Sequence, residues 1–123
     1  MTDNEITEKI IGAAYKVANT LGAGFLEKVY ENALFIELNK SGLKVKQQYN
    51  LPVYYENEKV GDYYADLFIE DSVIVELKTA KELAPEFSAQ VINYLKAAKL
   101  DTGLLINFGK QKIEIKRLFG NSK

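Results

Sequence analysis

The segment YYADLFIEDSVIVELKTAK, residues 63–81, places three charged residues inside two apolar runs. The runs are typical of two strands joined by a short acidic turn, and Asp66, Glu76 and Lys78 stand where such strands usually carry aliphatic side chains. If the hairpin is symmetric about Asp71, Asp66 lies opposite Glu76 and Lys78 lies on the same face. Two carboxylates and one lysine leave a net negative charge, which a cation or a raised pKa would neutralise.

Mg²⁺ suits this group of side chains, because it prefers carboxylate and water oxygens and needs neither histidine nor cysteine. The chain has no histidine and no cysteine, so its chemistry rests on carboxylates, lysines, amides and tyrosines, and disulfides and thiolate metal sites are excluded. The alternative is a purely structural cluster, in which Lys78 neutralises Asp66 and Glu76 without any catalytic role.

Helices and strands must position these residues. The spacing of apolar residues predicts helices within residues 2–24, 25–42 and 85–100. Thr2 and Glu5 form a capping pattern at the start of the first helix, which should end at the pair Gly22 and Gly24. The second helix stops at Gly42, and Pro85 suits the first turn of the third.

Alternating or continuous apolar residues predict strands. Residues 45–55 form two extended segments or one long strand bent at Pro52, and further strands are predicted at residues 60–69, 72–79, 102–108 and 112–118. The order ααβββ(β)αββ predicts an α/β or α+β single domain over residues 1–123, with a mixed β-sheet flanked by helices.

Length and charge narrow the function classes. The chain has 123 residues, the length of one ordinary domain, and 16 basic against 17 acidic residues give a formal net charge of −1. No overall basic charge indicates nucleic-acid binding, so such a partner would need a local patch. The polar, acidic N-terminal segment has no signal-peptide pattern and no apolar run reaches a membrane span, which favours a cytoplasmic protein that does not bind membranes.

Four ordered motifs resemble the GxxExxY proteins, a branch of the PD-(D/E)XK nuclease superfamily with a RecB-like motif layout. The naming motif stands as GFLEKVY at residues 24–30, and LLINFG at residues 104–109 is similar to the ending of the family. The remaining matches are Asp66, Glu76-Leu77-Lys78, and the pair Gln90 and Tyr94. Ala65 stands where the superfamily signature has proline. The resemblance implies a restriction-endonuclease-like fold.

The resemblance also implies metal-dependent hydrolysis of phosphodiester bonds in nucleic acid, DNA rather than RNA. Asp66, Glu76 and the carbonyl of Leu77 would hold Mg²⁺ or Mn²⁺, and Glu27 would supplement this metal site. Lys78 would orient the attacking water and offset the developing charge, because the neighbouring carboxylates favour a lysine that stays charged. Gln90 and Tyr94, four apart on a helix, would contact the phosphate or the water.

Several of these residues also have ordinary structural interpretations. Glu27 in the first turn of a helix is favoured by the helix dipole alone, and Tyr94 also fits the hydrophobic core. Tyr30 is expected to pack with a polar tip, and Gly24 to supply a turn conformation.

Partners follow less directly. Basic residues that could line a nucleic-acid groove stand at Lys81, Lys96, Lys99, Lys110, Lys112, Lys116 and Arg117. The small size and the near-neutral charge favour a homodimer or a protein partner. The alternative function is a non-catalytic module that binds nucleic acid or protein and keeps the nuclease fold.

Overall fold

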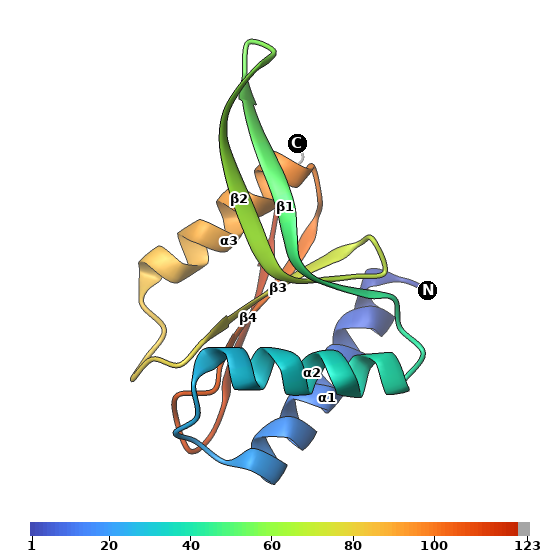
Figure 1. The fold of residues 1–123 in the computed structure, drawn as a ribbon, viewed down its shortest axis with the longest axis vertical. Coiled ribbons are helices and arrows are strands. Elements are labelled where there is room, and N and C mark those ends of the chain that lie inside the picture. Colours follow the sequence, from blue (N-terminus) through green and yellow to red (C-terminus); the bar gives the residue numbers. More distant parts are fainter. Residues whose placement is uncertain (121–123) are drawn as a thin grey trace.

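The computed structural model describes residues 1–120; residues 121–123, which the single-domain prediction includes, lie outside the described residues. The chain forms three helices and five strands within this range (Figure 1). They are α1 (Asp3–Leu21), α2 (Glu27–Lys40), β1 (Val45–Tyr55), β2 (Glu58–Ile69), β3 (Val73–Lys78), α3 (Pro85–Ala98), β4 (Thr102–Asn107) and β5 (Glu114–Phe119).

The predicted boundary signals are confirmed at the ends of the helices. The Thr2 hydroxyl accepts a hydrogen bond from the Glu5 N–H, and the Glu5 carboxylate accepts one from the Thr2 N–H, so the capping box is complete. α1 ends at Gly22, whose φ of 74° lies in the left-handed region. Residues 45–55 form one strand that contains Pro52, which decides between the two predicted arrangements.

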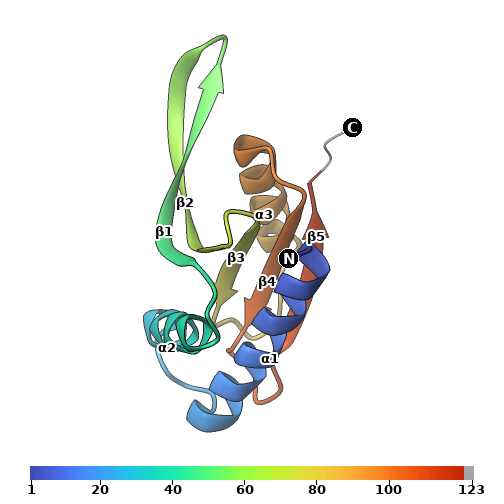
Figure 2. The same ribbon diagram turned by 90° about the vertical axis from the view of Figure 1, so that its right-hand side faces the viewer.

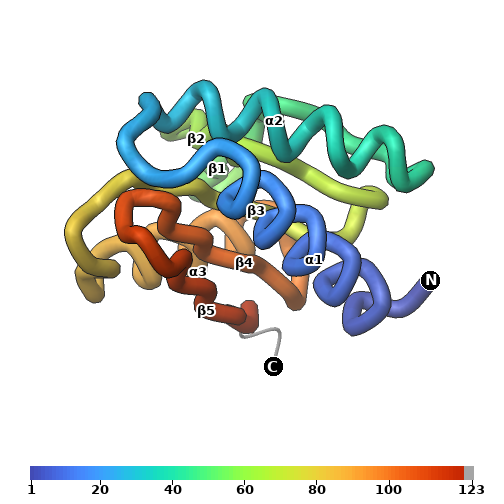
Figure 3. The backbone as a smooth tube through the Cα atoms, turned by 90° about the horizontal axis from the view of Figure 1, so that it is seen from below, coloured from blue at the N-terminus to red at the C-terminus, as the bar shows by residue number. Residues whose placement is uncertain are grey.

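The five strands form one mixed sheet in the order β1-β2-β3-β4-β5. All neighbouring pairs are antiparallel except β3 and β4, which are parallel and connected through α3. α1 and α2 cover one face of the sheet and α3 covers the other (Figures 2 and 3). The predicted mixed sheet flanked by helices is therefore confirmed.

A buried apolar cluster lies on each side of this sheet. One joins α1 and α2 to side chains such as Leu67, Val75 and Leu77, and the other joins α3 to side chains such as Phe68 and Ile74. Side chains alternate between the faces of a strand, so Glu76 and Lys78 lie on the face of β3 that α3 covers. Within residues 1–120, none of the helices has the length and hydrophobicity that a membrane span requires.

β1 and β2 extend well beyond the rest of the sheet. The backbone pairing of β2 with β3 covers residues 67–69 against residues 73–75, whereas β2 stays paired with β1 as far as Glu58 and Tyr55. Residues 49–65 thus form a two-stranded projection, here called the arm, whose outer half stands clear of the sheet (Figures 1 and 2). Glu56 and Asn57 at its tip have φ of 49° and 67°, as a tight primed turn requires.

Candidate active site

Asp66 and Glu76 meet where the arm separates from β3. The register predicted for the hairpin is confirmed, because Leu67 pairs with Val75 and Phe68 with Ile74. Beyond these pairs the carboxylates continue the contact. The Asp66 N–H donates to Glu76 Oε1 at 2.7 Å, and the Leu77 N–H donates to Asp66 Oδ2 at 2.8 Å. Each carboxylate therefore accepts a backbone N–H of the opposite strand.

Burial makes this carboxylate pair costly to ionise. Burial, and then the negative charge of Asp66, raise the pKa of Glu76 to about 8, against the opposing effects of the Asp66 N–H and of Lys78. Burial also raises the pKa of Asp66, although hydrogen bonds from the Leu77 N–H and the Gln48 amide oppose the shift. The metal-free protein thus keeps a proton on the carboxylate pair near neutral pH. A bound cation would displace this proton.

Lys78 lies within the field of these carboxylates without forming a direct ion pair. Its positive charge acts on the pKa of Asp66, Glu76 and Glu27 in the same direction, lowering each. Its ammonium group lies 4.7 Å from the centre of the Phe87 ring on α3. No ion pair within 4.0 Å involves Lys78 in residues 1–120. The ammonium group of Lys78 therefore lies beside the site without an ion-pair partner in residues 1–120.

Glu27 is the first residue of α2 and is exposed. Partial desolvation, followed by the charge of Asp66, raises the pKa of Glu27. Across residues 1–120, however, no three acidic side chains lie close enough to form a group that could hold a metal ion. Asp66 and Glu76 are linked by the hydrogen bond from the Asp66 N–H, and the exposed Glu27 has no hydrogen bond to either of them in residues 1–120.

Two residues that the sequence prediction missed connect α2 to this pair. Glu31 is only 3% exposed and accepts hydrogen bonds from Gln47, Gln48 and Lys28. The Gln48 amide donates both to Glu31 Oε1 at 2.9 Å and to Asp66 Oδ1 at 3.1 Å. Gln48 is held by the buried Glu31 carboxylate, and its amide in turn fixes the orientation of the Asp66 carboxylate.

A sequence signal existed for one of these two residues. Glu31 lies on the helical stripe that contains Leu34 and Leu38, and a carboxylate at such a buried position requires hydrogen-bond partners. Gln48 gave none, because its φ of 48° is left-handed in the middle of a strand, and glutamine is not a residue type that favours this conformation. Backbone strain of this kind gathers at functional sites.

α3 brings Gln90 and Tyr94 to the same region. Gln90 Nε2 donates to Tyr94 Oη at 3.1 Å, and Tyr94 is 7% exposed. Burial, and then the charges of Glu76 and Asp66, raise the pKa of Tyr94 to about 12. The phenol therefore keeps its proton at neutral pH and can donate a hydrogen bond into the site. The core interpretation of Tyr94 is also satisfied, because it belongs to the α3-side cluster.

Tyr30 anchors the loop in front of Glu27, as its predicted packing role requires. Its ring is fully buried and stacks on Phe108, with ring centres 4.6 Å apart. Its hydroxyl donates to the Gly22 carbonyl and accepts the Phe25 N–H. Gly24, between these contacts, has a φ of 108°, which a residue with a side chain would rarely adopt.

The segment after Lys78 is held by the end of β4. The buried Asn107 amide donates to the Ala80 carbonyl and accepts the N–H groups of Ala80 and Gly109. A Cβ on Gly109 would lie 2.4 Å from the Ala80 carbonyl oxygen, so only glycine allows the two backbones to approach this closely. These contacts fix the direction in which the chain leaves the sheet after β3 ends at Lys78.

Comparison with known proteins identifies the superfamily. A family model described as the PD-(D/E)XK nuclease superfamily matches residues 4–118. The chain belongs to this superfamily. The crystal structure of SSO0001 is similar to this PD-(D/E)XK chain with a TM-score of 0.60 and 16% sequence identity, over 96% of this chain and 60% of that one. At that identity the likeness shows the fold alone, which is restriction-endonuclease-like as predicted. The chain has no significant match among curated proteins.

Nucleases of the PD-(D/E)XK superfamily generally use divalent metals. The carboxylates of this chain fit a hard cation. Each oxygen of Asp66 accepts one hydrogen bond, which leaves it a further lone pair, and Glu76 Oε2 has no partner in residues 1–120. The assignment to the GxxExxY branch, which rests on residues 24–30, stays a prediction.

Proposed function

We propose that the chain is a metal-dependent nuclease that hydrolyses phosphodiester bonds in DNA. The observation that supports this most strongly is the buried pair of Asp66 and Glu76, whose carboxylates accept backbone N–H groups. Lys78 lies beside this pair without forming an ion pair to it, and the chain belongs to a superfamily of nucleases. A structural cluster would be expected to close that ion pair, because an unpaired buried charge destabilises a fold.

The proposal gives each residue a role. Asp66, Glu76 and the Leu77 carbonyl would hold Mg²⁺ or Mn²⁺, and a side-chain movement of the exposed Glu27 would complete the ligand set. Such an ion, when bound, polarises a phosphate and lowers the pKa of a coordinated water. The ammonium group of Lys78 orients the attacking water and offsets the negative charge that develops on the phosphorus oxygens.

α3 supplies hydrogen bonds to the same reaction. Tyr94 remains a neutral phenol, so its O–H can donate to a non-bridging phosphate oxygen. Gln90 already donates to Tyr94 and fixes the direction of that hydroxyl. We therefore assign the phosphate contact to Tyr94 and its positioning to Gln90.

The test is cleavage by the purified protein. Wild type and Lys78→Ala are incubated with linear duplex, circular single-stranded and branched DNA, and with RNA, in Mn²⁺ and again in EDTA. Cleavage that requires both the metal and Lys78 is expected. Lys9→Ala is the matched control, because Lys9 is an exposed lysine on α1, and it should cleave as wild type does.

One observation favours the alternative of a non-catalytic binding module, namely that residues 1–120 contain no preassembled group of three acids. That module would bind Mn²⁺ and nucleic acid without any cleavage. Metal-dependent stabilisation in a thermal melt, together with intact substrates in every reaction, would move this alternative ahead of the nuclease.

A further inference from the structure

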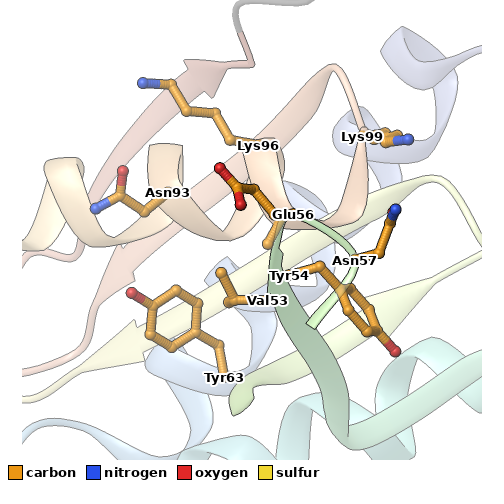
Figure 4. A pocket seen from close by; sticks show the side chains of 9 residues that line it. Val53, Tyr54, Glu56, Asn57, Tyr63, Asn93, Lys96 and Lys99 are labelled. Atoms are coloured by element: carbon orange, nitrogen blue, oxygen red, sulfur yellow. The ribbon is translucent and has the colours of Figure 1, made fainter. Parts of the chain in front are cut away.

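A groove lies between α3 and the part of the arm nearer its tip. Its larger cavity has a volume of about 770 Å³, with Tyr54 and Tyr63 of the arm on one side and Asn93, Lys96 and Lys99 at or near the end of α3 on the other (Figure 4). The groove exists because the arm extends past the end of its pairing with β3. None of these five residues was assigned a role in the candidate active site.

This groove reaches the Gln90 and Tyr94 side of the candidate active site. A second cavity of about 480 Å³ is lined by Gln90 and Tyr94, and it shares Tyr63 and Asn93 with the first. The Tyr63 ring packs on Tyr94 with ring centres 4.9 Å apart, and Tyr94 lies in the field of Glu76. A nucleic-acid strand lying in the groove would therefore run along α3 to Tyr94.

The arm presents aromatic rings to solvent. Tyr54 is 61% exposed and Tyr63 is 39% exposed, and both line the larger cavity. Exposed tyrosines on a strand can stack with nucleic-acid bases, and such stacking is independent of sequence. Only unpaired bases offer a free face for stacking, because the bases of a duplex already stack on one another.

The helix side of the groove presents cations and an amide. Lys96 and Lys99 are exposed, and neither forms an ion pair in residues 1–120. Glu56 faces them across the larger cavity, so the two lysines leave one net positive charge there. Glu86 adds one negative charge to the smaller cavity near Gln90. Electrostatic attraction in the groove is thus local and modest, and it needs the stacking to supplement it.

We infer that this groove binds a single-stranded segment of nucleic acid and leads it to the carboxylate pair. Bases stack on Tyr54 and Tyr63, and backbone phosphates contact Lys96 and Lys99. This inference rests on the proposed function for its direction toward the active site, and it adds the substrate class: a free single strand or the unpaired part of a branched molecule. A duplex and a protein partner are the competing occupants.

The test measures binding without cleavage. Fluorescence anisotropy in EDTA is used to follow a labelled 12-nucleotide dT strand, the same length of rU, and a 12-base-pair duplex. The single strands should bind more tightly than the duplex, and the dT and rU arms report which sugar is preferred. With two phosphate contacts, raising the salt from about 50 to about 200 mM should lower the dT affinity about sevenfold.

Two variants test the residues of the groove. Tyr54→Ala should weaken dT binding at least about fivefold, because stacking on one base is worth about 1 kcal/mol or more. The double variant Lys96→Ala/Lys99→Ala should weaken it and flatten the salt dependence by about 1.4 in the logarithmic slope. Lys9→Ala, which alters an exposed lysine on α1 that lines neither cavity, should match wild type.

The outcomes separate this inference from the proposed function. Tight dT binding that depends on Tyr54, with no cleavage in Mn²⁺, supports the groove and contradicts the nuclease. Cleavage that is unchanged in Tyr54→Ala and in the double lysine variant overturns the groove and leaves the nuclease standing. Equal affinity for the strand and the duplex, or no binding of any strand, also overturns the inference.

Discussion

Replacing Glu76 by glutamine should stabilise the metal-free protein at every pH above the ordinary pKa of Glu76, 4.5. Glutamine keeps the carbonyl oxygen that accepts the Asp66 N–H and nearly the same volume, and it removes the charge. The folded pKa of Glu76 is about 8, whereas its ordinary value is 4.5. Between these values the folded state holds a proton that the unfolded state has lost, so the free energy of unfolding falls as the pH rises.

The size of the effect follows from the same two values. One pKa unit corresponds to about 1.4 kcal/mol, so ionisation of Glu76 in the unfolded state, while the folded state keeps the proton, should remove about 3 kcal/mol of stability from wild type between about pH 5 and about pH 8. Wild type in EDTA should therefore lose that much relative to Glu76→Gln over this range. For a domain of this size the difference corresponds to roughly 10 °C in melting temperature at pH 8.

Urea denaturation at several pH values between 5 and 8, in EDTA, measures this directly. Glu8→Gln, which changes an exposed acid on α1, is the matched control and should follow wild type. Adding Mg²⁺ at pH 8 should restore stability to wild type and leave Glu76→Gln unchanged. Parallel pH profiles for wild type and Glu76→Gln would refute the reasoning, and a variant less stable at every pH would indicate the structural cluster instead.

Three further predictions concern the metal, the bridge and the chain turn after β3. Mg²⁺ or Mn²⁺ should raise the melting temperature of wild type and leave that of Asp66→Ala unmoved, and equal shifts would place the ions elsewhere. Gln48→Gly removes the bridge to Asp66 and relieves the left-handed backbone, so calorimetry should show metal affinity reduced about 10- to 100-fold while the stability in EDTA changes by less than about 1 kcal/mol; unchanged metal affinity would contradict the positioning role. Gly109→Ala should lower the free energy of unfolding by about 3 kcal/mol or more because its Cβ meets the Ala80 backbone, whereas Gly12→Ala on α1, with nothing within 4 Å of its Cβ, should be neutral or stabilising by up to about 1 kcal/mol.

Much of the fold could be predicted from local patterns. The capping box at Thr2, the helix start at Pro85 and the register that places Asp66 against Glu76 are all encoded within a few neighbouring residues. The roles of the site residues stay predictions. The sequence could indicate that Asp66 and Glu76 lie close together, since residues on adjacent antiparallel strands are brought together by the turn alone.

The parts that could not be predicted depend on contacts distant in sequence. The Gln48 amide bridges Glu31 and Asp66, and these three residues come from α2, β1 and β2. The groove requires the arm and α3, whose facing residues Tyr63 and Asn93 stand 30 positions apart and come from a strand and a helix. Neither a helical period nor an alternating strand contains that information, because each describes one element at a time.

The backbone N–H groups that donate to the Asp66 and Glu76 carboxylates allow metal binding to be followed by nuclear magnetic resonance. Mg²⁺ has no convenient optical signal, yet the amide protons of Asp66 and Leu77 point directly at the oxygens that would hold it. A ligand exchange at either carboxylate must change the length of that hydrogen bond, and with it the proton chemical shift and the rate of exchange with solvent. These two backbone resonances are therefore internal reporters of metal occupancy, and they need no label beyond ¹⁵N.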